Sequence, residues 1–295
     1  MGSTRQAKVR WLEMFPDELA AAIEGCPVCL FPFGLAEPHG PYNALGLDYL
    51  KAEALVERSA RTHGGVVAPP FAWHVQERPE FDWLGQHGVT QCFCSSIPSG
   101  LFLHIVLHQI RSLDARGFHV GILITGHYGG LERDLRLLSE YYVRQTGSPI
   151  RLWACADWEL IDYAGYKGDH AGPCETSQLM FLRPGLVDLD RSIVHSALGP
   201  MCGVAFPTAD GTIPSAELGR RIVESQVKRI GQIQCQLLDA YVPCDSYRPP
   251  NLQDTEDLWG RFERLTRKYW VLSQTLEEYM SGDVLQFPGW QALGE

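Results

Sequence analysis

The chain has no long apolar run, and none of its hydrophobic stretches approaches the ~20 residues that a helix needs to cross a bilayer. Its opening stretch, MGSTRQAKVRWLEMF, lacks the apolar region of a secretory signal, so we expect a cytoplasmic protein. Lysine and arginine form no block, and 25 basic against 35 acidic residues give a formal charge of -10. Nucleic acids and anionic membranes favour clustered positive charge, so the expected partner is a small molecule or another protein.

A disulfide framework is also lacking. The nine cysteines are an odd number, and several stand in apolar surroundings, such as Cys155 in LWACAD, which indicates reduced, buried thiols. The close pairs Cys26 with Cys29 and Cys92 with Cys94 offer ligands for zinc, but a structural zinc site normally needs four ligands in two such clusters. Because the first pair runs into a strand-like segment, we interpret these cysteines as structural.

What the sequence does contain is an alternation of strand and helix patterns. Apolar, β-rich runs bounded by Gly, Pro or Asp occur at residues 27–34, 64–70, 120–126 and 150–157. Helical spacing occurs at residues 48–61, 101–116 and 131–144. This order predicts an α/β fold with a mainly parallel sheet that helices cover on both faces.

The length of 295 residues allows one large domain or two small ones. A helical stretch at residues 254–279 and an aromatic tail follow the RPP segment at residues 248–250. We therefore expect one α/β domain over residues 1–245 and a helical C-terminal extension over residues 246–295.

Polar side chains that can bind a metal follow two of the predicted strands. Glu37 and His39 come after the first strand, and His127 comes after the third, in ITGHYGG. Ligands of open α/β sheets collect at the carboxyl ends of the strands, and residues two apart in an extended segment point the same way. Asp48, which directly precedes the first predicted helix, is a further candidate ligand, but taken alone it also fits a helix N-cap. His127 taken alone also fits a loop histidine with ordinary hydrogen bonds.

Two further residues of this kind lie downstream in GDHAGPCETSQLMFL, where His170 precedes Glu175 by five positions. Glu175 alone also fits an acid at a helix start, where the helix dipole favours it. Taken together, however, carboxylates and imidazoles in glycine-bounded loops after strands form the ligand set of one or two first-row divalent ions.

Three motifs resemble the creatininase (creatinine amidohydrolase) family, in that family's order. The family has a strand that ends in Gly, followed by Glu-x-His-Gly and a later Asp, and this pattern resembles PFGLAEPHGPYNALGLD. Its Gly-His-Gly-Gly-Asn or Gly-His-Tyr-Glu-Asn motif resembles TGHYGG. Its His-(Ala/Gly)-Gly-x-x-Glu-Thr-Ser motif resembles HAGPCETS. The resemblance covers roughly residues 10–240. It implies a three-layer α/β/α domain, often assembled into hexamers, with zinc, manganese or iron at a centre that hydrolyses amide C–N bonds.

The resemblance also implies roles for single residues. The implied metal ligands are Glu37, His39, Asp48, His127 and Glu175, with Asp48 as the bridge between two ions. His170 matches the family's acid–base histidine. The implied substrate contacts are Trp158, Tyr166, Tyr128 and Asp169.

The chain departs from the family pattern at two places. Gly129 stands where creatininase has a metal-binding Glu, and Gly130 stands where the other branch has Asn. The segment GVTQCFCSSI replaces a Phe-Pro-Gly-Thr segment. Either Glu175 supplies the missing ligand or only one metal binds tightly, and we expect a substrate other than creatinine.

Amide hydrolysis requires a strong nucleophile and a proton for the leaving nitrogen. A bound divalent ion can lower the pKa of its water from about 15.7 to about 7, and histidine, with an unperturbed pKa near 6.5, can transfer protons at neutral pH. We predict a metal-dependent amidohydrolase of small cyclic or linear amides that uses a metal-bound hydroxide and His170, in a homo-oligomer. A peptide-clipping relative, a metal-dependent lyase or isomerase, and a non-catalytic metal-stabilised scaffold remain as alternatives.

Another pair of histidines, His104 and His108, stands four residues apart on a predicted helix, as two zinc ligands would. The segment HIVLH lacks the Glu that follows the first His in metalloproteases. We interpret the pair as helix-surface or subunit-contact residues.

Overall fold

The computed structural model describes residues 8–75, 94–128, 130–162, 168–191, 212–271 and 286–293. Within these residues lies a parallel four-stranded sheet with the order β2–β1–β3–β4. The strands are β1 (Val28–Phe33), β2 (Val66–Val67), β3 (Val120–Thr125) and β4 (Arg151–Ala156). Each falls inside one of the four predicted runs, so the parallel sheet expected from the sequence is confirmed.

Helices connect the strands, as the alternating pattern predicts. They are α2 (Leu47–His63), α4 (Ser99–Asp114) and α5 (Leu131–Thr146), and each agrees with a predicted segment to within two residues at either end. The sequence analysis did not assign α1 (Pro16–Gly25), α6 (Pro173–Leu182) or α7 (Ala216–Asp239). No helix in the described parts of the chain is long and apolar enough to cross a membrane.

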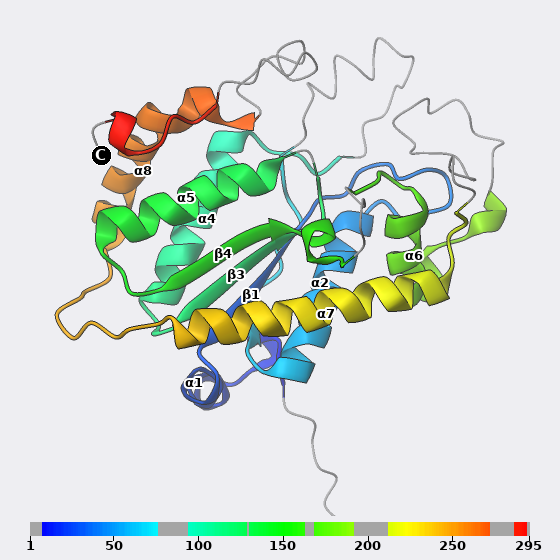
Figure 1. The fold of residues 1–295 in the computed structure, drawn as a ribbon, viewed down its shortest axis with the longest axis horizontal. Helices are drawn as coiled ribbons and strands as arrows, with labels where there is room; N and C mark the ends of the chain where they lie inside the picture. The colour runs from blue at the N-terminus through cyan, green and yellow to red at the C-terminus, as the bar shows by residue number, and fades with distance from the viewer. Residues whose placement is uncertain are drawn as a thin grey trace, which may run out of the picture.

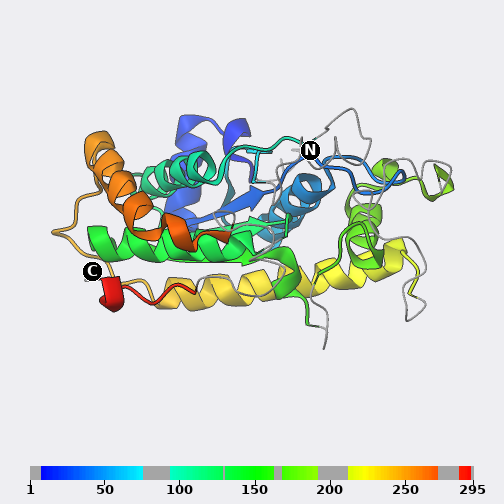
Figure 2. The same ribbon diagram turned by 90° about the horizontal axis from the view of Figure 1, so that it is seen from above.

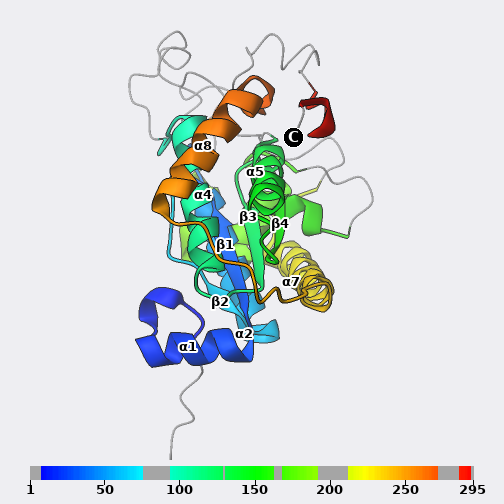
Figure 3. The same cartoon turned by 90° about the vertical axis from the view of Figure 1, so that its left-hand side faces the viewer.

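The sheet is the middle one of three layers, because successive side chains of a strand point to opposite faces. Phe31 and Phe33 of β1 pack in one apolar cluster with α4 and α5, whereas Val28 and Leu30 pack in a second cluster with α2 and α7. Figures 1 and 3 show α4 and α5 on one side of the strands and α7 on the other, and Figure 2 shows α7, in yellow, as a long straight helix. Every residue of β1 and β3 is buried, as a sheet covered on both faces requires.

The C-terminal extension packs on the layer formed by α4 and α5 (Figure 1). The N-cap of its helix α8 (Leu252–Thr266) is Asn251, whose side chain accepts the Asp254 N–H at 2.9 Å. Phe262, Trp270 and Trp290 belong to the same apolar cluster as the α4 and α5 side chains. The division predicted at residue 246 thus separates parts that share one core, and it stays a prediction.

A buried acid in α5 makes stability depend on pH. Asp134 accepts the Val271 N–H at 3.1 Å, and burial raises its pKa from 3.8 to about 7. Because the folded state retains a proton that the unfolded chain releases, this contribution to the free energy of unfolding is fully present below about pH 4 and is lost as pH rises through 7. The total is on the order of 4 kcal/mol.

Asp134→Asn should therefore flatten the decline in stability between about pH 4 and pH 8, because the amide does not titrate. Urea unfolding across that range tests this expectation. A variant whose profile follows that of the wild type would show that Asp134 does not titrate in this window.

Candidate metal centre

The five predicted metal ligands lie together near the carboxyl ends of β1 and β3. Figure 1 shows these ends directed toward the side of the molecule that carries α6. The loop after β1 supplies two of the ligands, the first turns of α2 and α6 supply one each, and the residues after β3 supply the fifth. All five are buried: Glu37, His39, Asp48, His127 and Glu175.

Two glycines let α2 begin directly against the strand ends. A Cβ atom at Gly34 would lie 2.5 Å from the Tyr49 nitrogen, and one at Gly126 would lie 2.2 Å from the Asp48 carbonyl oxygen. Any other residue at either position would displace the first turn of α2. The N-cap alternative for Asp48 is wrong, because the N-cap is Gly46 and the Asp48 carboxylate faces the two histidines.

Two sets of donor atoms share the Asp48 carboxylate. In the first set, His127 Nδ1 lies 3.0 Å from Glu37 Oε1 and 3.2 Å from Asp48 Oδ2. In the second set, His39 Nε2 lies 3.1 Å from Asp48 Oδ1 and 3.7 Å from Glu175 Oε2. In each set the donor atoms lie within 4.8 Å of one another. The two oxygens of Asp48 therefore face different sets, which is the arrangement that a bridging carboxylate requires.

The His39 ring is oriented as metal-binding histidines usually are. Its Nδ1 lies 3.0 Å from the Glu37 carbonyl oxygen, which can only accept, so we assign the proton to Nδ1. Its Nε2 faces the carboxylates and has no hydrogen-bond partner among the described residues. Metal-binding histidines commonly donate their other ring N–H to a backbone carbonyl, which fixes the orientation of the ring.

The electrostatics of the cluster favour added positive charge. Burial alone would lower the pKa of His39, but Asp48, Glu175 and Glu37 raise it to about 9. Burial also lowers the pKa of His127, but Glu37 and Asp48 outweigh this effect and hold that pKa well above its usual value. Burial raises and the histidines lower the pKa of Asp48, to well below the usual range. The carboxylates thus stabilise any cation that comes between them.

A buried lysine adjoins the cluster, and the sequence analysis did not identify it. Lys51 Nζ donates to Glu175 Oε1 and, at 2.8 Å, to the Tyr128 hydroxyl, and it lies 3.4 Å from Asp157 Oδ2. Tyr128 in turn donates to Asp157 at 2.6 Å. The sequence could have indicated this lysine, because Lys51 follows Asp48 by three residues on α2 and residues three apart lie on the same face of a helix.

Comparisons with known proteins identify the family of this chain. A sequence profile of the family named Creatininase, described as creatinine amidohydrolase, matches residues 13–233. The chain belongs to the creatininase family. As a member of this family it is a metal-dependent hydrolase that acts on C–N bonds.

Individual creatininase-family proteins are similar over most of their length. The chain is 27% identical over 231 residues to creatinine amidohydrolase of Pseudomonas putida, which covers 68% of this chain and 84% of that protein. It is 30% identical over 218 residues to the mycofactocin precursor peptide peptidase of Mycobacterium ulcerans (strain Agy99), with coverage of 68% and 82%. A crystal structure of creatinine amidohydrolase (creatininase) matches with a TM-score of 0.60 at 25% identity, over 80% of this chain and 99% of that one. The three-layer α/β architecture is thereby confirmed.

The histidine with the expected acid–base role, His170, lies at the edge of the cluster of five predicted ligands. His170 Nε2 lies 3.1 Å from the Pro38 carbonyl oxygen, so this nitrogen donates and Nδ1 is left as the basic atom. Nδ1 lies 3.8 Å from Glu37 Oε1, and the ring is 4.4 Å from that of His39. With 40% of its side chain exposed, His170 contacts both the cluster and solvent.

The predicted substrate contacts differ in their surroundings. Tyr128 and Trp158 approach each other at Gly168, where an added Cβ would lie 3.2 Å from both rings. Asp169 accepts the backbone N–H groups of Cys174 and Glu175 at 2.8 and 3.1 Å, and so stabilises the start of α6. Tyr166 and Gly129 lie outside the described residues. The substrate roles stay predictions.

Removing the buried ammonium should destabilise the fold. Lys51→Met leaves Glu175 and Asp157 without their buried cation, and breaking one side of a buried ion pair typically lowers the free energy of unfolding by about 3–5 kcal/mol. Urea unfolding of metal-free protein measures this change. Arg220→Met, which breaks exposed ion pairs on α7, is the control and should change stability by less than about 1 kcal/mol. Equal effects of the two variants would contradict the account of Lys51.

Proposed function

We propose that this chain hydrolyses an amide C–N bond in a small cyclic or linear amide at a centre of two divalent ions. In this proposal Glu37, Asp48 and His127 hold one ion, and His39, Asp48 and Glu175 hold the other. The observation that carries the proposal is that two buried donor sets share Asp48 through its two different oxygens.

The donor chemistry supports this assignment. Three carboxylates and two imidazoles suit zinc, manganese or iron, and His39 presents Nε2 to the Asp48 carboxylate while the Glu37 carbonyl holds its Nδ1. Such ions, when bound, polarise a carbonyl group and lower the pKa of a water molecule. Asp157 and Glu175 pair with the buried Lys51 ammonium. Glu37 and Asp48 face the two histidines instead, so negative charge is left for the ions to balance.

The remaining residues have defined tasks in the proposed reaction. His170 takes up at Nδ1 the proton that the attacking water loses and delivers it to the nitrogen that leaves when the C–N bond breaks, while its Nε2–H keeps the ring oriented on the Pro38 carbonyl. Lys51 fixes one oxygen of Glu175, and the Ala171 N–H fixes the other at 2.8 Å, so Glu175 is positioned before any ion arrives. Trp158 and Tyr128 provide flat walls for a planar amide.

The substrate that we propose is not creatinine, because Gly129 stands where the family resemblance implies a metal-binding Glu and GVTQCFCSSI replaces the family's Phe-Pro-Gly-Thr segment. Assays of lactams, formamides, creatinine and short peptides with zinc, manganese or iron(II) test the proposal. We expect turnover of at least one non-creatinine amide, dependent on metal and abolished by a chelator. A fully metal-loaded protein that turns over creatinine alone would overturn this substrate assignment.

Peptide cleavage is the second candidate. The 30% identity to a mycofactocin precursor peptide peptidase favours it, and the partial exposure of His170 is compatible with a longer substrate. Products released from the peptides of the same panel distinguish the two functions. We also propose a cytoplasmic homo-oligomer. The family resemblance implies six copies, and light scattering of the purified protein tests this number.

The missing family ligand leads to a specific prediction. Glu132, in the first turn of α5, is the next acid after Gly129; it is only 8% exposed, and burial raises its pKa. It is in neither donor set, whereas Glu175 lies 3.7 Å from His39. Glu175→Gln should therefore reduce bound metal by about one ion per chain, and Glu132→Gln should leave the content unchanged. Metal analysis after dialysis decides, and a loss of metal in the Glu132 variant alone would reverse the assignment.

A further inference from the structure

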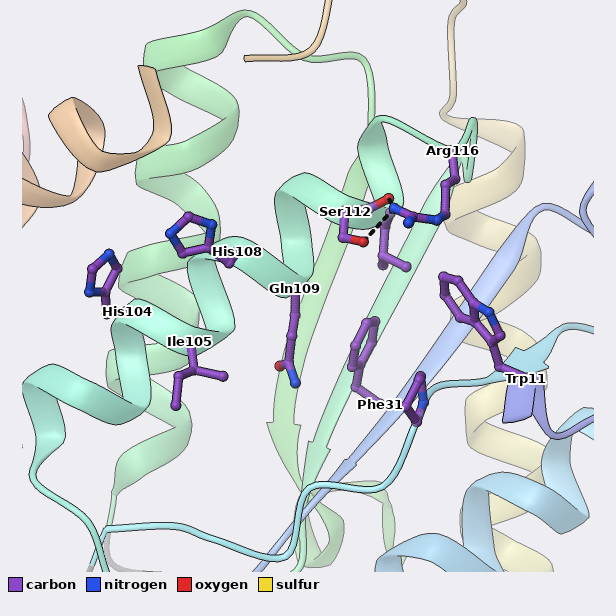
Figure 4. A pocket seen from close by; sticks show the side chains of 10 residues that line it. Trp11, Phe31, His104, Ile105, His108, Gln109, Ser112 and Arg116 are labelled. Atoms are coloured by element: carbon purple, nitrogen blue, oxygen red, sulfur yellow. Dashed lines mark hydrogen bonds between the residues drawn. The ribbon is translucent and has the colours of Figure 1, made fainter. Parts of the chain in front are cut away.

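A second group of potential ligands lies at the contact between α4 and the C-terminal extension. His104 and His108 are one turn apart on α4, and Figure 4 shows their rings side by side. Glu256 of α8 reaches both of them: its oxygens lie 3.1 Å from His104 Nε2 and 2.8 Å from His108 Nε2. The sequence pattern lacked a third ligand, and the fold supplies one from 148 residues away.

The three donor atoms have the spacing of a metal site. In a tetrahedral zinc site with ligand distances of about 2.0–2.1 Å, neighbouring donor atoms are ~3.3 Å apart. A single oxygen, Glu256 Oε1, lies 3.2 Å from His104 Nε2 and 2.8 Å from His108 Nε2, and these separations need to widen by only a few tenths of an ångström to admit an ion. Two histidines and one glutamate are also a known zinc ligand set, in which a water completes the coordination.

The surroundings hold these ligands in place while leaving them accessible. The His104 ring stacks on Trp259 of α8, with centroids 4.6 Å apart and planes at 8°. Both histidines line a cavity of about 550 Å³, and the side chains of His104, His108 and Glu256 are 26%, 31% and 47% exposed. A hydrated ion can therefore reach the donor atoms without unfolding.

We propose that His104, His108 and Glu256 bind a zinc-type divalent ion that fastens α8 to α4. Two imidazoles among three protein ligands favour Zn²⁺ or Co²⁺ over Mn²⁺, which prefers oxygen donors. An ion here would join the C-terminal extension to the α/β domain at the edge of their shared apolar cluster, next to Trp259. This site is separate from the centre around Asp48, with which it shares no ligand.

The test compares wild-type protein with Glu256→Gln, using ZnCl₂ as the probe. Equilibrium dialysis should find one zinc ion fewer per chain in the variant, or a dissociation constant at this site that is raised by at least about 100-fold. Replacing even a residue that only hydrogen-bonds to a metal ligand lowers metal affinity by about 10–100-fold. Hydrogen exchange of the α8 amides gives an independent readout. With free zinc at ~100 times the dissociation constant, local opening of α8 should fall by up to about 100-fold in the wild type and stay unchanged in the variant.

Glu263→Gln is the matched control, because Glu263 lies two turns further along α8 and forms an ion pair with Arg267 at 3.3 Å, away from the two histidines. It should bind zinc as the wild type does. Equal zinc counts in the wild type and Glu256→Gln would mean that the three residues form a hydrogen-bonded contact only, which overturns the proposal. Zinc that binds without slowing exchange in α8 would overturn the fastening role.

Discussion

Replacing Asp48 by alanine is expected to empty the metal centre and to lower turnover by at least about 10³-fold. Asp48 is the only side chain common to both donor sets, so its loss removes an oxygen ligand from each ion at once. Removing a single preorganised electrostatic group from an active site typically costs about 10²–10³ in rate, and here the group serves two ions. Metal content after dialysis and turnover of the substrate found in the amide panel measure the two effects.

The control for this variant is another buried carboxylate. Asp114 is buried and accepts hydrogen bonds from Tyr142 and Tyr247, away from the cluster. Asp114→Ala tests whether loss of any buried acid lowers metal content through loss of stability. An Asp48→Ala protein that keeps its full metal content and activity would contradict the bridging role.

Replacing His170 by alanine is expected to give the second large effect, a loss of about 10²- to 10⁴-fold in turnover with the metal content unchanged. Its Nδ1 faces Glu37 at 3.8 Å, and its Nε2 is held by the Pro38 carbonyl, so the ring is placed to exchange a proton at Nδ1. The measurement is kcat at saturating substrate together with metal analysis of the same preparation.

His170 also forms a possible ligand group with Glu37 and His39, which makes this test informative. Loss of metal from His170→Ala would move the residue into the ligand set and would contradict its assignment to proton transfer. His119→Ala, which removes a half-buried histidine stacked on Tyr241, is the control and should retain both metal and turnover.

The parts of the structure that could be predicted from the sequence are those with local patterns. The strands around residues 27–34 and 120–126 were found because their apolar runs are short and end at glycine, and α2, α4 and α5 were found from helical spacing. The grouping of Glu37, His39 and His127 could be expected, because parallel strands place their carboxyl ends at one edge.

The parts that could not be predicted depend on contacts between distant segments. Lys51 is an ordinary helix residue in sequence, and only the fold shows that it lies between Glu175 and Asp157. Glu132 is an acid at the start of α5, and nothing in its local sequence shows that the fold buries it. Glu256 has no sequence relation to His104 and His108, so their cluster depends on how α8 packs on α4.

A crystal structure of the metal-loaded protein, with the ions located by anomalous scattering, tests the central claim most directly. The account predicts two ions on opposite oxygens of Asp48, one bound by Glu37 and His127 and the other bound by His39 and Glu175. Ions bound elsewhere, or an Asp48 carboxylate that contacts no ion in the fully loaded protein, would contradict it.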